Sequence, residues 1–494
     1  MQLSAIEIGS RSVKLIWWKS VSAIALLVAT ASTAALAQTY QTIVNNPGPN
    51  GQPDAGLVQG TDGYLYGMMV SPHGTLFRTS VNGGLTTLYP FCAKAPCTDG
   101  TNVNGVIQAT DGNFYGTARY GGTGTYCSSY CGTVFKITPG GAFSKLHDFC
   151  SEHPCLDGGN PLAGLIQGTD GNFYGTTSVG GTMGHGTAFR ITPGGALTTL
   201  YDFCSELDCH DGANPRAPLV QATDGNFYGT TGNDGTGAYC GGYCGTVFQM
   251  TPTGDLKTLY SFCAESGCRD GAYPVAGLVQ ASDGYLYGTT EYGGANGGYG
   301  TVFRISTDGE LTTLYSFCHE SGCTDGNWPT APLIQATNGN LYGLTYRGGS
   351  ADLGTIFGTS TEGELTTLHS FSHASTNGSN PLAPLVQDTN GILYGTTQLG
   401  EGTSVLGTVY SLSLGLGPFV TVEPKSGKVG SAVTIRGTNL TGATSVTFHG
   451  TRAAFKVVSA SEITTTVPTG ASTGTITVVT PSGTLSSNVP FQIP

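Results

Sequence analysis

The sequence contains few charged residues and, after residue 37, no long hydrophobic run. Only 10% of its residues are charged, against about 25% in average proteins. A transmembrane helix needs roughly 18 or more consecutive apolar residues, and the chain from residue 38 onward offers none. The formal net charge is −12, and an acidic chain without a basic stripe binds nucleic-acid phosphates poorly. We therefore expect no membrane span in the mature chain and no nucleic-acid partner.

A sustained helical period is also missing beyond residue 40. In its place are 78 glycines, about one residue in six where about 7% is usual. The other residues are largely Thr, Leu, Val, Tyr and Phe, which favour β-strands. This composition predicts an all-β fold with many tight turns.

The linear signatures of common catalytic sites are absent. There is no HExxH motif, since His319-Glu320 lacks the second histidine, and no G-x-S-x-G elbow or phosphate-binding loop. We expect no cofactor and no metal. We also expect a protein without catalytic activity rather than an enzyme. Glycosidases need only two carboxylates without a linear motif, so loop residues such as Asp234 and Glu291 keep a glycan-active enzyme as an alternative.

The first 37 residues have the pattern of an export signal. Arg11, Lys14 and Lys19 precede the apolar stretch VSAIALLVATASTAALA, and Ala35-Leu36-Ala37 fits the small-x-small cleavage pattern. Residues 1–37 are predicted to be a signal peptide, which places the mature chain in a secreted, periplasmic or cell-surface location. Removing them takes away three cations and one carboxylate and leaves a net charge of −14.

An internal repeat of 49 to 59 residues dominates the sequence. The segment LVQATDGNFYGTT, residues 219–231, recurs seven times. The glutamine of this segment falls at Gln59, Gln108, Gln167, Gln221, Gln280, Gln335 and Gln387. Each copy continues through a Gly-rich stretch into GTVFRI-like text, and six copies then reach LTTLYSF-like text.

Each repeat therefore offers four short strands. An Asp-Gly or Asn-Gly turn joins the first two and predicts a hairpin, and four antiparallel strands per repeat is the pattern of a β-propeller blade. The seventh repeat lacks its fourth strand, but residues 40–44 precede the first repeat just as LTTLYSF precedes the others. We predict a seven-bladed β-propeller over residues 38–414 that is closed by its N-terminal strand.

All 14 cysteines fall into local pairs, and a repeat that lacks one member lacks both. In an exported chain this pattern predicts disulfides. A metal site needs about four converging ligands, whereas each loop supplies two. The expected pairs are Cys92/Cys97, Cys150/Cys155, Cys204/Cys209, Cys263/Cys268 and Cys318/Cys323 after the fourth strand, and Cys127/Cys131 and Cys240/Cys244 between the second and third strands.

In an up-and-down blade these two kinds of loop lie on one face, and long variable loops on a rigid scaffold commonly carry binding sites. Residues that break the seven-fold repeat on this face are the candidates for ligand binding, because tyrosines mixed with charges suit sugars or protein segments. A structural role in covering the blades is the alternative. The candidates are Arg119, Tyr120, Tyr126, Tyr130, His185, Asp234, Tyr239, Tyr243, Tyr273, Glu291, Tyr292, Tyr299, Trp328, Tyr346 and Arg347.

Residues present in every repeat favour structural roles. The seven glutamines are expected to bond backbone between blades, with a polar channel lining as the alternative. The acids that open each first turn are replaced by Asn338 and Asn390 in the last two repeats, which favours a turn role over a charge. A turn role is also favoured for the acids after the second cysteine, and Ca²⁺ binding by several of them is the alternative.

The repeat stops after residue 414, and residues 415–418 form a linker. From Phe419 to Pro494, short alternating strands with Gly, Ser and Thr turns predict an immunoglobulin-like sandwich. Pro424, Gly427 and Gly430, with VTIRGTNL, VTFHGTRA and Val467-Pro468, make this segment resemble an IPT/TIG domain. In an exported chain that resemblance implies an adhesion or spacer module.

The repeats themselves are similar to the GloVer tandem repeats of bacterial "choice-of-anchor" secreted proteins. GYGTVFRI, LTTLYSF, DGAYPVAGLVQ and DGYLYGTTEYGG carry the resemblance, which covers residues 56–412. Taken together, the sequence predicts an exported, non-catalytic binding or adhesion protein that recognises a glycan or an extracellular protein through the disulfide-bearing face. A glycan-active hydrolase or lyase and a structural cell-surface protein are the alternatives.

Overall fold

A computed structural model describes residues 38–45, 52–53, 55–70, 73–124, 131–151, 153–239, 241–372, 377–400 and 406–493. Nearly all regular structure in these ranges is β-strand. The exceptions are two short 3-10 helices, η1 (Leu207–Cys209) and η2 (Ser321–Cys323). Among the described residues, no helix has the length and apolar character that crossing a membrane requires. The all-β fold expected from the composition is therefore confirmed.

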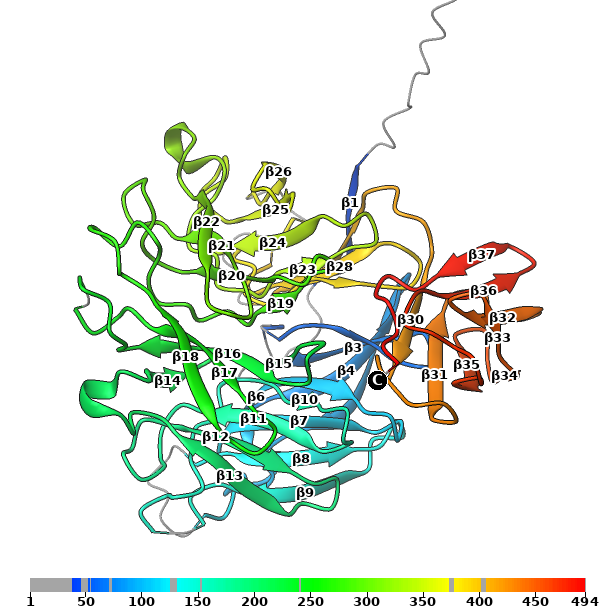
Figure 1. The fold of residues 1–494 in the computed structure, drawn as a ribbon, viewed down its shortest axis with the longest axis horizontal. Coiled ribbons are helices and arrows are strands. Elements are labelled where there is room, and N and C mark those ends of the chain that lie inside the picture. The colour runs from blue at the N-terminus through cyan, green and yellow to red at the C-terminus, as the bar shows by residue number, and fades with distance from the viewer. Residues whose placement is uncertain are drawn as a thin grey trace, which may run out of the picture. The chain divides into compact units, whose positions relative to one another are not determined.

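Strands β1 to β29 form seven antiparallel sheets, one for each sequence repeat. The glutamine of the repeat ends the first strand of each sheet, which has only two residues in six of the seven sheets, and the sheets follow one another along the chain (Figure 1). Their strands are β2 (Val58–Gln59), β3 (Leu65–Met69), β4 (Thr75–Ser80) and β5 (Gly83–Pro90); β6 (Thr101–Gln108), β7 (Phe114–Tyr120), β8 (Thr133–Ile137) and β9 (Phe143–Asp148); β10 (Ile166–Gln167), β11 (Phe173–Thr177), β12 (Thr187–Ile191) and β13 (Leu197–Asp202); β15 (Val220–Gln221), β16 (Phe227–Asn233), β17 (Thr246–Met250) and β18 (Leu256–Ser261), with β14 (Ala213–Pro215) paired to β16; β19 (Val279–Gln280), β20 (Leu286–Thr290), β21 (Thr301–Ile305) and β22 (Leu311–Ser316); β23 (Ile334–Gln335), β24 (Leu341–Thr345), β25 (Thr355–Thr359) and β26 (Leu365–Ser370); β27 (Val386–Gln387), β28 (Leu393–Thr397), β29 (Thr408–Ser413) and β1 (Thr39–Asn45).

The first strand of the chain completes the last sheet. β1 pairs antiparallel with β29, and Tyr40 lies opposite Leu412. In Figure 1 the blue strand β1 lies beside the yellow strands of that sheet. The N-terminal strand therefore takes the place of the fourth strand that the seventh repeat lacks, as the sequence predicts.

The repeated glutamines link each sheet to the next. Each glutamine side-chain oxygen accepts a hydrogen bond from a backbone N–H in the first turn of the neighbouring sheet, at 2.8 to 3.2 Å. The donor–acceptor pairs are Thr61–Gln108, Thr110–Gln167, Thr169–Gln221, Thr223–Gln280, Ser282–Gln335, Thr337–Gln387 and Thr389–Gln59. The last pair returns to the first sheet, so the backbone role expected for these residues is what the structure shows.

The first turn of each sheet uses its Asp or Asn as a local hydrogen-bonding group. In the fourth sheet, Asp224 accepts hydrogen bonds from the N–H of Asn226 (3.0 Å) and the hydroxyl of Tyr228 (2.8 Å). In the seventh sheet, Asn390 instead donates its amide to the hydroxyl of Tyr394 (3.0 Å). An amide and a carboxylate both serve here, as a turn role requires.

The hydrophobic core lies between neighbouring sheets. One cluster joins Tyr115 and Val134 of the second sheet to Phe173 and Phe189 of the third, all of them fully buried. The third strand of six sheets carries a buried Phe over a glycine of the second strand. A Cβ at Gly229, for example, would lie only 2.5 Å from Phe248. Glycine is required in this strand because an aromatic ring takes the space of its side chain.

The C-terminal strands form two further antiparallel sheets. One contains β30 (Val420–Glu423), β31 (Ala432–Gly437), β35 (Glu462–Thr466) and β34 (Phe455–Val457), and the other contains β33 (Thr451–Arg452), β32 (Ser445–Phe448), β36 (Ile476–Thr480) and β37 (Gly483–Ser486). Alternating buried residues of both sheets, including Ile435 and Val478, share one core. This segment therefore has a hydrophobic core of its own.

Five of the expected cysteine pairs are disulfides. Each closes a four-residue loop directly after the fourth strand of its sheet, and the pairs are Cys92–Cys97, Cys150–Cys155, Cys204–Cys209, Cys263–Cys268 and Cys318–Cys323. Cys127 and Cys240 lie outside the described residues, so the pairs Cys127/Cys131 and Cys240/Cys244 remain predictions.

Candidate functional site

Most of the predicted binding residues lie in two kinds of loop at one end of their sheets, because the strands alternate in direction, and Arg119 and Tyr120 end strand β7. One kind joins the second and third strands, and the other follows the fourth strand. Tyr126 and Tyr130 lie outside the described residues. Of the remaining candidates, the structure brings Tyr243, Tyr273 and Tyr292 into contact and places Glu291 beside them. We call these four residues, with Arg216, the tyrosine cluster.

Tyr273 is held by the backbone in a conformation that is unusual for its residue type. It has a positive φ of 58°, its N–H donates to the carbonyl of Cys244 (2.8 Å), and its carbonyl accepts from the N–H of Glu291 (3.1 Å). Trp328 has the same backbone geometry in the next sheet, with φ 55°. The equivalent residues of four other repeats are Asn102, Asn160, Asn214 and Asn380, also with positive φ.

Asparagine tolerates this left-handed region better than bulky residues do. Tyr273 and Trp328 are therefore placed where the repeat elsewhere uses the less strained residue. Strained backbone at residues of this size is common at ligand sites. This contrast is the strongest local sign that these two aromatic side chains serve something other than folding.

The rings of the tyrosine cluster form an accessible aromatic surface across two sheets. Tyr273 stacks on Tyr292 with centroids 5.6 Å apart and planes inclined by 21°. Tyr243 meets Tyr273 edge to face at 6.0 Å. Tyr243 is 65% exposed and Tyr292 39% exposed. Rings that are packed on one side and open on the other can stack on a flat apolar face of a ligand.

Charged groups of both signs border these rings. The Arg216 guanidinium lies 5.4 Å from the centre of the Tyr273 ring. Burial raises the pKa of Glu291, and the Tyr292 hydroxyl and Arg216 oppose this rise without cancelling it. The Glu291 carboxylate, followed by burial, raises the pKa of Tyr292 to about 12. The cluster therefore offers a cation, a carboxyl group and hydroxyl donors around the aromatic surface.

The other candidates form smaller, separate groups. Burial raises the pKa of Asp234, and the neighbouring His185 partly offsets it. The guanidinium of Arg119 lies 4.8 Å from the Tyr120 ring centre and donates to Asn160, and Arg347 similarly lies beside Tyr346. The N–H of Trp328 donates to the carbonyl of Tyr299, and Tyr239 is an exposed side chain whose N–H donates to the carbonyl of Cys263.

Arg216 was missed at the sequence level. It follows Pro215 at the end of β14 and reaches Tyr273, whose loop belongs to the next sheet. A signal did exist, since it is a cation in a segment that precedes the first strand, where none of the other repeats has a cation. The contact itself spans two repeats and depends on how neighbouring sheets are placed.

The carboxylates after the second cysteine are occupied within their own loops. Asp211 accepts hydrogen bonds from the N–H of Ser205 (2.9 Å) and from the hydroxyl of Tyr201 (2.8 Å). Asp270 and Asp325 bond in the same way. These hydrogen bonds give the three carboxylates a structural role within their loops.

Two open hollows of about 410 and 440 Å³ lie elsewhere. The first is lined by β1 residues and Asn377, and the second by residues that include His147, Asp157 and Asp202. Neither contains a residue of the tyrosine cluster. We base the candidate site on the cluster because these hollows are open and lack its exposed, packed aromatic rings, which can stack on a ligand.

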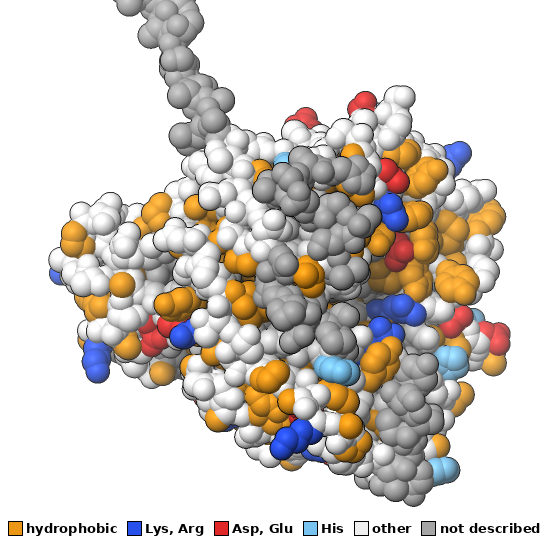
Figure 2. Space-filling model, turned by 180° about the vertical axis from the view of Figure 1, so that it is seen from behind, with side chains coloured by type: hydrophobic (Ala, Val, Ile, Leu, Met, Phe, Trp, Pro, Cys, Tyr) orange, Lys and Arg blue, Asp and Glu red, His pale blue; other side chains and the backbone are white. Residues whose placement is uncertain are grey.

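Charged side chains are sparse on the face drawn in Figure 2. Lys, Arg, Asp and Glu stand there singly or in small mixed groups. Two groups of described residues have metal-ligand types close together, and each consists of a histidine beside a disulfide: His73 with Cys92 and Cys97, and His185 with Cys204 and Cys209. Their sulfur atoms are engaged in disulfide bonds.

The sequence profile of the Gloeobacter/Verrucomicrobia repeat matches residues 30–244 and again residues 240–458. The chain belongs to this repeat family. The two adjoining matches together span most of the chain, so each covers several of the seven repeats counted above. Membership of the Gloeobacter/Verrucomicrobia repeat family confirms the resemblance seen in the motifs, and it specifies no ligand.

Several solved structures align with this family member at low sequence identity. A fungal alcohol oxidase of the AA5 family, in complex with copper, aligns with a TM-score of 0.50 at 10% identity over 92% of this chain and 99% of its own. The extracellular domain of a hybrid two-component system from B. thetaiotaomicron gives 0.48 at 12% identity, over 92% of this chain and 57% of its own. PorZ, a surface component of the type-IX secretion system of Porphyromonas gingivalis, gives 0.48 at 14%, over 92% and 61%. At 10% identity the alignment with the oxidase reaches the fold alone. None of the curated proteins is detectably similar in sequence.

Proposed function

We propose that this Gloeobacter/Verrucomicrobia repeat protein is an exported, non-catalytic binding protein that recognises a glycan through the tyrosine cluster. In this proposal residues 38–414 are a seven-bladed propeller closed by β1, and residues 419–494 are an immunoglobulin-like domain of the IPT/TIG type. Residues 1–37 are the signal peptide that directs the chain out of the cytoplasm.

The hydrogen-bond chain through the glutamines supports the propeller. It passes through seven sheets and returns to the first, as a closed ring requires. The pairing of β1 with β29 supports closure by the N-terminal strand. The shared core of two four-stranded sheets supports the immunoglobulin-like domain.

Five disulfides support an oxidising destination, because such bonds persist outside the cytoplasm. One observation carries the binding role: Tyr273 keeps an aromatic ring in a left-handed backbone position between the exposed rings of Tyr243 and Tyr292. A sugar ring offers an apolar face for stacking and hydroxyls that Arg216 and Glu291 can bond.

Screening the mature protein against an array of neutral and acidic polysaccharides should identify a glycan that binds saturably. Tyr273→Asn introduces the residue that four other repeats carry, so it removes the ring while keeping the backbone conformation. Losing a stacking contact of about 1–1.5 kcal/mol should weaken binding roughly 10-fold. Titration calorimetry of the wild type and of Tyr273→Asn and Tyr243→Ala measures this loss.

Tyr285→Ala is the matched control. Tyr285 is 38% exposed and also has an arginine beside its ring, but it lies in the first turn, at the opposite end of its sheet. The Tyr285→Ala protein should bind the glycan as tightly as the wild type. Equal affinities for all these variants would remove the tyrosine cluster from the binding role.

A glycan-active hydrolase is the second candidate, because burial raises the pKa of both Glu291 and Asp234. A carboxyl group whose pKa is raised is a better candidate for a general acid than an ordinary one. Under this alternative Glu291→Gln abolishes release of reducing ends from the bound glycan. Our proposal predicts no turnover by the wild type, while Glu291→Gln retains binding within a few-fold. Turnover that is lost in that variant would favour the enzyme.

A further inference from the structure

The residue before the Gly-Thr that opens the third strand varies between sheets in an ordered way. It is a histidine or a cysteine in the first four sheets and an apolar or aromatic residue in the last three. Along the chain these residues are His73, Cys131, His185, Cys244, Tyr299, Leu353 and Leu406. Both types found in the first four sheets are ligands for soft and borderline metal ions.

The backbone fixes this position over the loop that follows the fourth strand. The carbonyl of His185 accepts a hydrogen bond from the N–H of Asn214 (2.9 Å), and that of His73 accepts one from Asn102 (3.0 Å). Tyr299 makes the same bond with Trp328 (3.0 Å). The backbone at this position is therefore held against the loop that follows the fourth strand in these three sheets.

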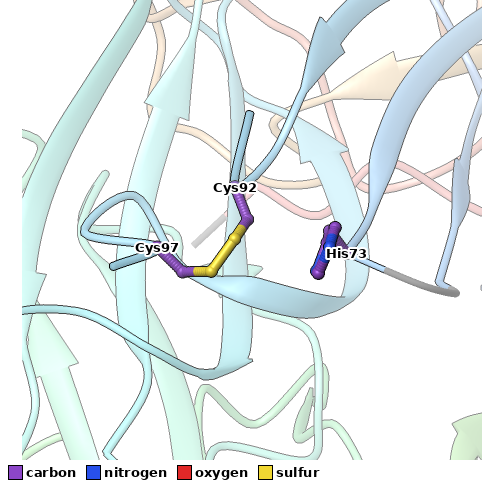
Figure 3. Close-up of side chains that lie close together, drawn as sticks. All are labelled: His73, Cys92 and Cys97. Carbon is purple, nitrogen blue, oxygen red and sulfur yellow. A yellow bond between two sulfur atoms is a disulfide. The ribbon is translucent and has the colours of Figure 1, made fainter. Parts of the chain in front are cut away.

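Each of the two histidines lies beside a disulfide of its own sheet. A ring nitrogen of His73 and the two sulfurs of Cys92 and Cys97 all lie within 4.8 Å of one another, and so do those of His185, Cys204 and Cys209. Figure 3 shows His73 beside the disulfide, reaching it from a different segment of the chain. Two thiols per loop appeared too few for a metal, and the fold supplies a third ligand.

The cysteines of these loops have left-handed backbone conformations. The φ angles are 51° and 54° for Cys92 and Cys97, and 63° and 54° for Cys204 and Cys209. This region is costly for residues other than glycine and asparagine. Cys97 and Cys209 are also partly accessible. A reductant can therefore reach the disulfide at these cysteines.

We propose that each histidine and its disulfide form a redox-gated site for a borderline divalent cation such as Zn²⁺. A small external thiol breaks the S–S bond: two thiol molecules give two electrons and two protons and leave as their own disulfide. The two cysteine thiols then lose their protons to water as Zn²⁺ binds. Two thiolates and a neutral imidazole supply three ligands, at the usual 2.3 Å and 2.0–2.1 Å, and water takes the fourth position.

The cysteine loop of the fifth sheet, which has no histidine beside it, provides the matched control. Cys318–Cys323 has the same spacing and loop, but Tyr299 takes the place of the histidine. Zn²⁺ bound to the mature protein is counted by native mass spectrometry after reduction with a phosphine, which does not compete for the metal. The count should fall by one in His73→Tyr and by one in His185→Tyr. It should rise by one in Tyr299→His.

The oxidised protein should bind none of these Zn²⁺ ions. With Co²⁺ in place of Zn²⁺, the reduced wild type should show thiolate-to-cobalt absorption that weakens in each His→Tyr variant. A metal count that is the same in all four proteins, or the same before and after reduction, would overturn the proposal. Loss of the β-sheet circular dichroism on reduction would also overturn it, because the sites require the folded loops.

Discussion

Replacing Tyr40 with alanine is expected to lower the free energy of unfolding by about 3 kcal/mol, as for other packed aromatic residues. Tyr40 connects the first strand to the last two sheets of the repeat region. Its ring stacks on His369 at 3.9 Å, and its hydroxyl donates to the carbonyl of Asn377 (2.7 Å). It also lies 5.3 Å from Tyr410 of β29.

The effect should be large because β1 serves more than one sheet. Tyr40 packs with residues of the sixth and seventh sheets, whereas Ile43 and Val44 pack in a cluster that contains Leu65 and Phe77 of the first sheet. Losing the Tyr40 ring weakens the junction between the two ends of the repeat region, where no covalent connection exists.

Chemical denaturation followed by tyrosine and tryptophan fluorescence measures the loss. Gln41→Ala is the control, since the Gln41 side chain is exposed on the same strand, and surface substitutions usually change stability by less than about 0.5 kcal/mol. A Tyr40→Ala protein as stable as Gln41→Ala would show that β1 adds little to the fold.

Asp388→Ala is expected to stabilise the protein at neutral pH by about 2–3 kcal/mol. Asp388 is 2% exposed, and only one of its carboxylate oxygens has a hydrogen bond, from the N–H of Asn390 (2.9 Å). The other repeats have Ala or Gly at this position. The alanine variant therefore restores a side chain that the surrounding structure already accommodates.

The gain should depend on pH with a defined sign. Burial raises the pKa of Asp388 from 3.8 to about 6. A raised acid pKa means that the folded state favours the neutral form, so stability from this group is full below pH 3.8 and is lost as the pH rises through 6. Each pKa unit corresponds to about 1.4 kcal/mol. Asp388→Ala should thus gain most above pH 6 and little or nothing near pH 3.5.

Thermal unfolding of both proteins between pH 3.5 and 8 tests this expectation. Asp308→Ala, which removes an exposed carboxylate from a turn, should run parallel to the wild type. A constant difference between Asp388→Ala and the wild type across this range would mean that Asp388 is not the buried charge described here.

The sheets were predictable because each structural requirement repeats seven times. The Asp or Asn turn, the glutamine and the glycine of the second strand recur in all seven repeats, and each has one local role. The cysteine pairs were predictable because their members are lost together. The limits of the first strands and the presence of the extra strand β14 were not predictable, since they depend on contacts with neighbouring sheets.

The tyrosine cluster was predictable only as a set of residue types. Tyr243, Tyr273 and Tyr292 were candidates because they depart from the repeat, but the sequence does not show which departures meet. Arg119 and Tyr346 depart equally and lie elsewhere. The positive φ at Tyr273 and the contact of Arg216 with its ring arise from the packing of one sheet against the next.

Amide hydrogen exchange of the mature protein tests most directly whether the first strand seals the seven sheets. If β1 is the fourth strand of the last sheet, peptides covering residues 39–45 and 408–413 should exchange slowly and lose protection together as denaturant is added. Exchange of residues 39–45 at the rate of an unstructured peptide, while residues 408–413 stay protected, would contradict the closed ring.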